Sequence, residues 1–171
     1  MLFEAQKAAH AKHATVVEAA ELPPEITALE PLPKSPRNAY GVIPMGLNTW
    51  ERPFAELLDH DANGIVTWWH RNELRRPWSV NVLMPDGRGF YPDFVIGVSG
   101  RRTENNILLA DPKFYFQSDD EAPKIMAEHQ TYGRVLIVYR DGIRWMTVGY
   151  DAKAQKPILA REFRLADAPG F

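Results

Sequence analysis

The chain contains no cysteine among its 171 residues. Disulfide bonds and thiolate-held metals are therefore excluded, and any bound metal must use oxygen or imidazole ligands. Such ligands favour a hard cation. We expect Mg²⁺, with Mn²⁺ as the alternative.

Long apolar runs are also lacking, and no segment of the sequence could span a bilayer. The first twenty residues carry Glu4, Lys7, Lys12 and Glu18, so they lack the uninterrupted apolar stretch of a signal peptide. These two absences predict a cytoplasmic protein without a membrane partner.

The chain has no excess of positive charge, since its formal net charge is −2. A polyanion would therefore have to be held by a local cluster of cations. Residues 70–102 contain six arginines against three acidic residues, a local charge of +3. The candidates for nucleic-acid binding in this segment are Arg71, Asn72, Arg75, Arg76, Arg101 and Arg102. A solvated arginine-rich surface is the alternative interpretation.

Several common catalytic signatures are missing as well. The sequence has no GxSxG nucleophile elbow and no GxxxxGK[ST] phosphate loop. Its five histidines show no zinc-ligand spacing. Chemistry in this chain must therefore depend on carboxylates, amines and an oxygen-held metal.

The residues that are present divide the chain into three parts. Residues 1–21 are rich in alanine and predict a helix. Residues 22–47 contain six prolines and predict an extended arm laid against the body. Residues 48–171 carry the regular patterns of a compact domain.

Within this domain the pattern predicts two helices and several strands around one mixed sheet, an α/β or α+β fold. Asn48 or Thr49 can cap the first helix, which should end near His60. A second helix should run from Ser118 to about Tyr132. The expected strands are 65–70, 78–84, 90–98 and 106–111, followed by a closing hairpin of 134–139 and 143–150.

Two aspartates stand out because they lie in otherwise apolar strands. Side chains alternate along a strand, so Asp111 and Lys113 point to the same face. Asp93, like Asp111, is a carboxylate within an otherwise apolar strand, here the expected strand 90–98. A carboxylate in such surroundings is costly unless it is paired or binds a metal. If the two strands are neighbours, Asp93 and Asp111 can bind one or two Mg²⁺ ions.

Glu51 is a third candidate ligand, because it lies at the end of the buried face of the first expected helix. Glu56 projects elsewhere and is the weaker choice. Lys113 would orient the attacking water and stabilise the pentacovalent phosphate. Metal and lysine together meet the needs of phosphodiester hydrolysis near neutral pH.

Glu51 in WERPFAELLD, Pro92 and Asp93 in FYPDF, and Asp111 to Lys113 in LLADPK resemble the E, PD and DxK elements of the PD-(D/E)xK nuclease superfamily. The run from Trp50 to Lys113 is similar to nuclease domains at the C-terminal side of restriction and phage-defence helicases. This resemblance implies a restriction-endonuclease-like fold, with divalent metal at Glu51, Asp93 and Asp111 and catalysis by these residues with Lys113.

Two details bear on the match. A second PD pair, Pro85 and Asp86, precedes a glycine in a turn, where aspartate is expected for local hydrogen bonding. Pro112 lacks an amide, so its strand must be at an edge, bulged or ending there.

The segment WWHRN, residues 68–72, could stack on nucleic acid, although core packing of at least one tryptophan is the alternative. Alternation places Trp68 and Trp69 on opposite faces, with one in the core and the other under the proline arm.

The sequence thus predicts a Mg²⁺-dependent DNA endonuclease, the module of a larger helicase-containing defence or restriction enzyme. DNA is its expected partner, together with a helicase domain or subunit. The rival is an inert nucleic-acid-binding or docking module that kept the fold and lost turnover.

Overall fold

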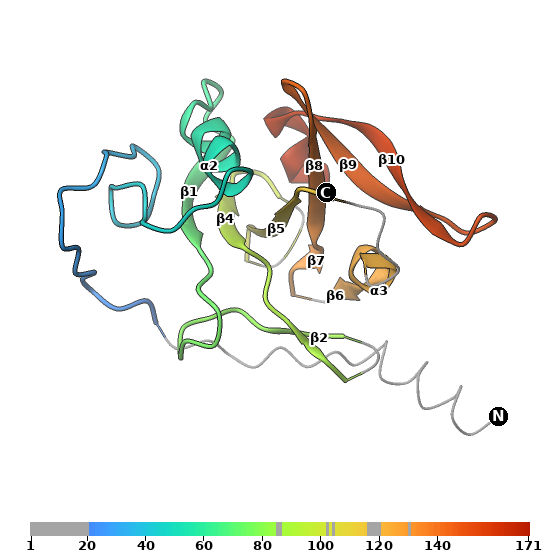
Figure 1. Cartoon of the computed structure of the whole chain (residues 1–171), viewed down its shortest axis with the longest axis horizontal. Coiled ribbons are helices and arrows are strands. Elements are labelled where there is room, and N and C mark those ends of the chain that lie inside the picture. Colours follow the sequence, from blue (N-terminus) through green and yellow to red (C-terminus); the bar gives the residue numbers. More distant parts are fainter. Residues whose placement is uncertain (1–20, 85–86, 102, 104, 116–120, 130) are drawn as a thin grey trace.

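The protein is built on one mixed β-sheet of six strands in the order β1-β4-β5-β8-β9-β10 (Figure 1). The computed structural model describes residues 21–84, 87–101, 103, 105–115, 121–129 and 131–171. The helix expected at the N-terminus and the competing Pro85–Asp86 pair lie outside these residues. Within them, no helix is long and apolar enough to cross a membrane.

The strands of the main sheet are β1 (Val66–Arg71), β4 (Phe94–Val98), β5 (Ile107–Lys113), β8 (Leu136–Asp141), β9 (Arg144–Asp151) and β10 (Lys156–Phe163). All neighbours are antiparallel except β5 and β8, which are parallel. A parallel pair needs a long crossover connection. Residues 114–135 provide it, including the helix α3 (Glu121–Met126).

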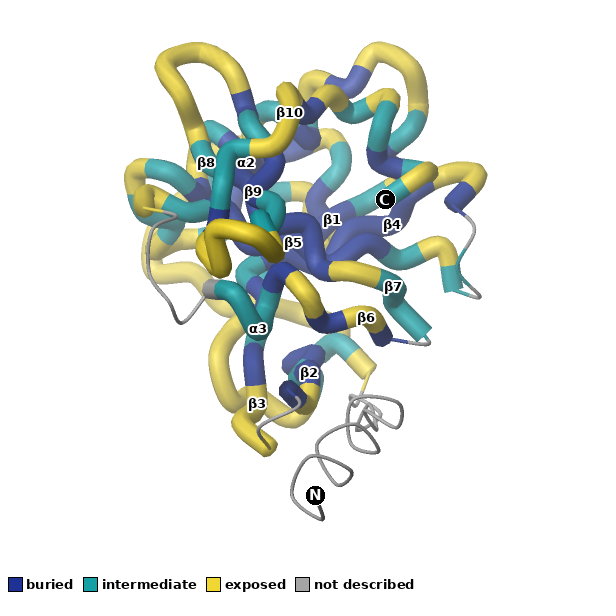
Figure 2. The backbone as a smooth tube through the Cα atoms, turned by 90° about the vertical axis from the view of Figure 1, so that its right-hand side faces the viewer, coloured by how far each residue is buried: buried dark blue, intermediate teal, exposed yellow. Residues whose placement is uncertain are grey.

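Both faces of the central strands are covered, which explains their nearly continuous apolar sequence. On one face α2 (Glu51–Asp59) places Phe54, Ala55 and Leu58 against β4, β5 and β8. The other face packs against Ile125 and Ala127 of the crossover and against the hairpin β2–β3 (Val82–Leu83 and Gly89–Phe90). Figure 2 shows the buried residues gathered at α2, β1, β4 and β5.

The proline-rich arm lies partly against the body, along the outer edge of the sheet (Figure 1). Trp69 of β1 exchanges backbone hydrogen bonds with the arm, donating to Arg37 O at 2.9 Å and accepting from Ala39 N at 2.8 Å. Ile43 of the arm is buried in the core beside α2. The arm therefore satisfies part of an edge strand that would otherwise expose unpaired backbone groups.

The expected first helix, the strand 65–70, the strand 106–111 and the closing hairpin are confirmed to within a few residues. Trp68 and Trp69 do point to opposite faces, and Trp69 is fully buried. Its indole Nε1 donates to Asp59 Oδ1 at 2.8 Å. Trp69 is the core residue of the pair, whereas Trp68 packs at the edge of the opposite cluster.

Other expectations need correction. The expected strand 78–84 is reduced to Val82–Leu83, and the strand 90–98 is broken before Phe94. The described part of the second helix ends at Met126, and a short pair of strands, β6 (Glu128–His129) and β7 (Gly133–Arg134), follows. Beyond the closing hairpin, β10 adds an unexpected edge strand.

Candidate active site

The strand register brings the two unusual aspartates together. Phe94 of β4 pairs with Ala110 of β5, so the preceding residue Asp93 comes opposite Asp111. Asp93 lies in a bend just before β4 and not inside a continuous strand. The side chains of Val95 and Leu109, two residues away on each strand, belong to one buried cluster. Asp93 and Asp111 therefore share the same face of the sheet.

The Asp93 carboxyl is hydrogen-bonded to that of Asp111, and its pKa is raised from 3.8 to about 9. Burial is the largest cause, followed by the charge of Asp111 and the hydrogen bond with it. Glu51 raises this pKa further, and Lys113 lowers it. Asp93 therefore keeps its proton to a higher pH than a free aspartate does, because ionising it in this buried place beside Asp111 is costly.

Lys113 is held at the pair by an ion pair with Asp111, whose Oδ2 is 2.7 Å from Lys113 Nζ. Asp111 is only 1% exposed, whereas the lysine side chain is 23% exposed. The expectation that these two residues point to the same face is confirmed. The ammonium therefore has access to solvent next to a carboxylate that has almost none.

Glu51 approaches the pair from the N-terminus of α2, but its carboxylate already has partners. Glu51 Oε2 accepts a hydrogen bond from Asn48 N at 3.0 Å and lies 3.3 Å from Arg71 Nη2. Asn48 Oδ1 in turn accepts from Glu51 N at 2.7 Å. This reciprocal capping explains both the start of α2 and the burial of Glu51. It makes Glu51 a neighbour of the aspartate pair with a structural role of its own.

A cavity of about 390 Å³ opens over Asp93, Asp111 and Lys113, and we call it the carboxylate cavity. Arg88 from the β2–β3 hairpin and Lys124 from α3 also line it. The sequence alone did not indicate these two cations as site residues. Arg88 contributed only to the local charge count, and Lys124 carried no signal before the position of α3 was known.

An adjoining cavity of about 470 Å³ is lined by Asp93, Tyr91 and the loop after β1. Three of the predicted nucleic-acid-binding arginines, Arg71, Arg75 and Arg76, line it. Arg75 has a φ of +58°, a strained conformation for a residue with a side chain. These arginines thus lie beside the aspartate pair, where cations could hold a polyanion.

The other predicted nucleic-acid contacts are placed differently. Arg101 is 5% exposed, and its guanidinium donates to Tyr132 O at 2.6 Å, so it is committed inside the fold. Arg102 lies outside the described residues.

Asn72 is buried, and it positions the bend that carries Asp93, a role that the local sequence did not indicate. Its Nδ2 donates to Pro92 O at 2.8 Å and to Val80 O at 2.9 Å. Its backbone N–H donates to Asp93 O at 2.8 Å. Asn72 thereby fixes the bend that carries Asp93.

A proline is tolerated at position 112 of β5 because β5 is no longer paired with β4 there. Pairing with β4 stops at Ala110, whereas pairing with β8 continues through Pro112 and Lys113. The missing amide therefore costs no hydrogen bond to β4, in agreement with the expectation of an ending strand.

The donor set fits a divalent cation with two protein carboxylates. Asp111 Oδ2 is buried and has no hydrogen-bond partner of ordinary geometry among the described residues, apart from its ion pair with Lys113. Mg²⁺ is commonly held by one or two carboxylates, with water and substrate phosphate completing the shell. However, no group of three or more histidine, aspartate or glutamate side chains in the described residues could hold a metal directly. In this conformation the Glu51 carboxylate is held by Asn48 and Arg71.

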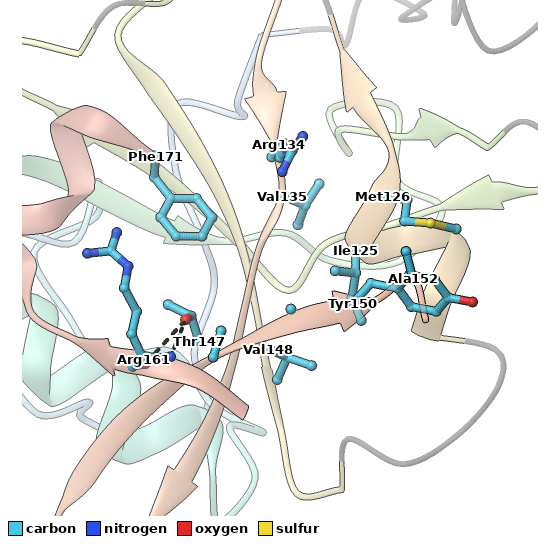
Figure 3. A pocket seen from close by; sticks show the side chains of 12 residues that line it. Ile125, Met126, Arg134, Val135, Thr147, Val148, Tyr150, Ala152, Arg161 and Phe171 are labelled. Atoms are coloured by element: carbon cyan, nitrogen blue, oxygen red, sulfur yellow. Dashed lines mark hydrogen bonds between the residues drawn. The ribbon is translucent and has the colours of Figure 1, made fainter. Parts of the chain in front are cut away.

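A separate cavity of about 500 Å³ lies between α3, β9, β10 and the C-terminal Phe171 (Figure 3). Arg134 and Arg161 are its charged side chains, and no aspartate or glutamate is among its lining residues. Thr147 Oγ1 donates a hydrogen bond to Arg161 O and accepts one from Arg161 N, each at 3.2 Å. This cavity offers no acid–base pair, although it is larger than the carboxylate cavity.

Comparisons of the chain with known protein families, with curated proteins and with solved structures gave no match.

Proposed function

We propose that this chain is a divalent-metal-dependent deoxyribonuclease of the PD-(D/E)xK type with a restriction-endonuclease-like fold. One observation carries the proposal: the Asp93 and Asp111 carboxyls are in contact, and Lys113 Nζ lies 2.7 Å from Asp111. A carboxyl pair that includes one strongly raised pKa, beside a lysine in a cavity, is typical of a catalytic site. The mixed six-stranded sheet with helices on both faces is compatible with this fold.

In this proposal each residue has a defined task. Asp93 and Asp111 would hold the cation, which would supply positive charge to the phosphate oxygens and acidify a water. Lys113 donates a hydrogen bond that orients this water or stabilises charge on the phosphate. Glu51 would hold Arg71 beside the aspartate pair through their ion pair. Asn72 holds Asp93 in place.

The inert docking module remains the rival function. It is favoured by the contacts of the Glu51 carboxylate with Asn48 and Arg71, because these contacts occupy a group that a metal site would use. Participation in a helicase-containing defence or restriction enzyme is suggested by the sequence resemblance alone.

A Lys113→Ala variant separates the two functions. We expect the parent chain to nick supercoiled plasmid with Mg²⁺ and not with EDTA. The variant should lose about a hundredfold or more in rate, because it lacks the donor that acts on the transition state. The matched control is Lys153→Ala, which removes an exposed lysine from the β9–β10 turn. Equal rates in parent and Lys113→Ala would contradict the proposed mechanism, and no metal-dependent nicking by the parent would support the inert module.

The cavity lined by Arg71, Arg75 and Arg76 predicts that DNA binding depends on salt. If Arg71, Arg75 and Arg76 contact three phosphates, affinity should fall by roughly 40-fold between 50 and 200 mM salt. Arg76→Ala should reduce the slope of log affinity against log salt by about 0.9. Arg144→Ala is a fair control, since both arginines are exposed and pair with an acid three residues earlier. Fluorescence anisotropy with labelled DNA measures both slopes; identical slopes would exclude Arg76 from the contact.

A further inference from the structure

Three aromatic side chains form a ledge whose residues are adjacent in sequence to Glu51 and Lys113. Trp50 immediately precedes Glu51, and Phe114 and Tyr115 immediately follow Lys113. The rings of Trp50 and Phe114 are stacked, with centroids 5.5 Å apart and planes 30° apart. Phe114 and Tyr115 meet edge to face at 4.4 Å. Two segments distant in sequence therefore join their aromatic residues in one cluster, each next in sequence to a residue of the aspartate site.

The ledge is open to solvent. Phe114 is 53% exposed and Tyr115 is 75% exposed, whereas the aromatic residues of the main core are buried. Among the described residues these two are the only exposed large aromatic side chains, and they are consecutive. A contiguous group of exposed apolar rings is typical of a binding surface.

We propose that this ledge stacks on unpaired DNA bases and makes the site selective for single-stranded or frayed DNA. Aromatic rings stack on any base, and the faces of the bases are accessible only when they are not stacked within a duplex. The cations lining the neighbouring cavities complement the phosphates of such a strand. This inference rests on the proposed nuclease function and names its substrate class.

The ledge is close enough to act on the same strand that is cut. Phe114 is three residues beyond Asp111, so their Cα atoms are at most roughly 10 Å apart. Stacked nucleotides rise about 3.4 Å each along one strand. Allowing for the reach of the two side chains, the stacked base would lie within a few nucleotides of the phosphate held at the aspartate pair.

The test compares a double variant, Phe114→Leu with Tyr115→Leu, with the parent chain. These changes keep apolar side chains and remove the aromatic faces. Binding to a labelled single strand and to the corresponding blunt duplex is measured by anisotropy in EDTA, where Mg²⁺-dependent cleavage cannot occur. Loss of stacking should weaken single-strand binding by roughly tenfold and leave duplex binding within about twofold.

Two further variants make the result specific. Ile143→Ala removes another exposed apolar side chain, far along the sequence from the ledge, and should change neither affinity. Tyr115→Leu alone serves if the double variant has a lowered melting temperature, because this ring is the more exposed of the two. Equal binding of both DNA forms by the parent, or an unchanged affinity of the ledge variant for the single strand, would overturn the inference.

The binding readout separates this inference from the proposed function. If the parent chain prefers single strands, the ledge variant loses this preference and neither cleaves DNA with Mg²⁺, the ledge inference is supported and the nuclease proposal is contradicted. Cleavage of DNA by parent and ledge variants with the same preference would support the nuclease and overturn the ledge.

Discussion

Asp111→Asn and Asp93→Asn are each expected to lower Mg²⁺-dependent DNA cleavage by at least about a hundredfold. Each substitution replaces one of the two carboxylates proposed to hold the cation with an amide that carries no charge. Nicking of supercoiled plasmid measures the loss. Asp141→Asn provides the control, because Asp141 is an exposed residue of the same sheet that pairs with Arg144. Cleavage by either site variant at the parental rate would end the proposed mechanism.

The same variants should retain the fold, and Asp93→Asn should stabilise it in the absence of metal. The pKa of Asp93 is raised from 3.8 to about 9, so the folded chain retains a proton that the unfolded chain releases. The stability of the metal-free parent therefore falls as the pH rises from about 4 to about 9. Asparagine has no such dependence. We expect Asp93→Asn to exceed the parent by about 1 to 3 kcal/mol at pH 7, and the difference to shrink toward pH 4.

Thermal unfolding with and without Mg²⁺ gives a second readout of the site. Mg²⁺ should raise the melting temperature of the parent by mass action and have little effect on the two asparagine variants. An equal increase in parent and variants would place the metal away from Asp93 and Asp111.

The second large effect is a steep rise in Mg²⁺ affinity with pH. A carboxyl that holds its proton up to about pH 9 must release it before it can bind a cation. Affinity should therefore increase by up to tenfold per pH unit well below pH 9, and by roughly fiftyfold between pH 7 and 9. Calorimetric titration with MgCl₂ in buffers of different ionisation enthalpy should detect the release of about one proton at pH 7.

Asp93→Asn is also the control for this pH dependence. The variant should bind Mg²⁺ weakly at every pH, with little of the parental slope. A pH-independent affinity in the parent would show that the Asp93 proton is not displaced by the metal. The nuclease proposal would then need a ligand other than this carboxylate.

Local sequence was sufficient for the chemistry carried by single elements. Alternation along β5 placed Asp111 and Lys113 on one face, because the side-chain period of a strand is fixed by its backbone. Helical spacing placed Glu51 on the buried face of α2 with Phe54 and Leu58, as the structure has them. Both predictions depend on residues a few positions apart.

The sequence was less informative where a segment is stabilised by distant partners. The bend before Phe94 is held by hydrogen bonds from Asn72, more than twenty residues earlier, and the predicted continuous strand missed it. Arg101 was predicted on charge alone to contact nucleic acid. Its burial depends on the carbonyl of Tyr132, which no local pattern brings near.

The sequence by itself determined which residue types are available: no thiol, two aspartates next to apolar runs, and a lysine two residues after one of them. Only the tertiary structure decided that Asp93 comes opposite Asp111, that Glu51 is held by Arg71, and that the rings of Trp50 and Phe114 meet. The physical reason is that side-chain direction follows from local backbone geometry. Strand register and the contacts between elements instead follow from how the apolar faces of the whole chain are buried together.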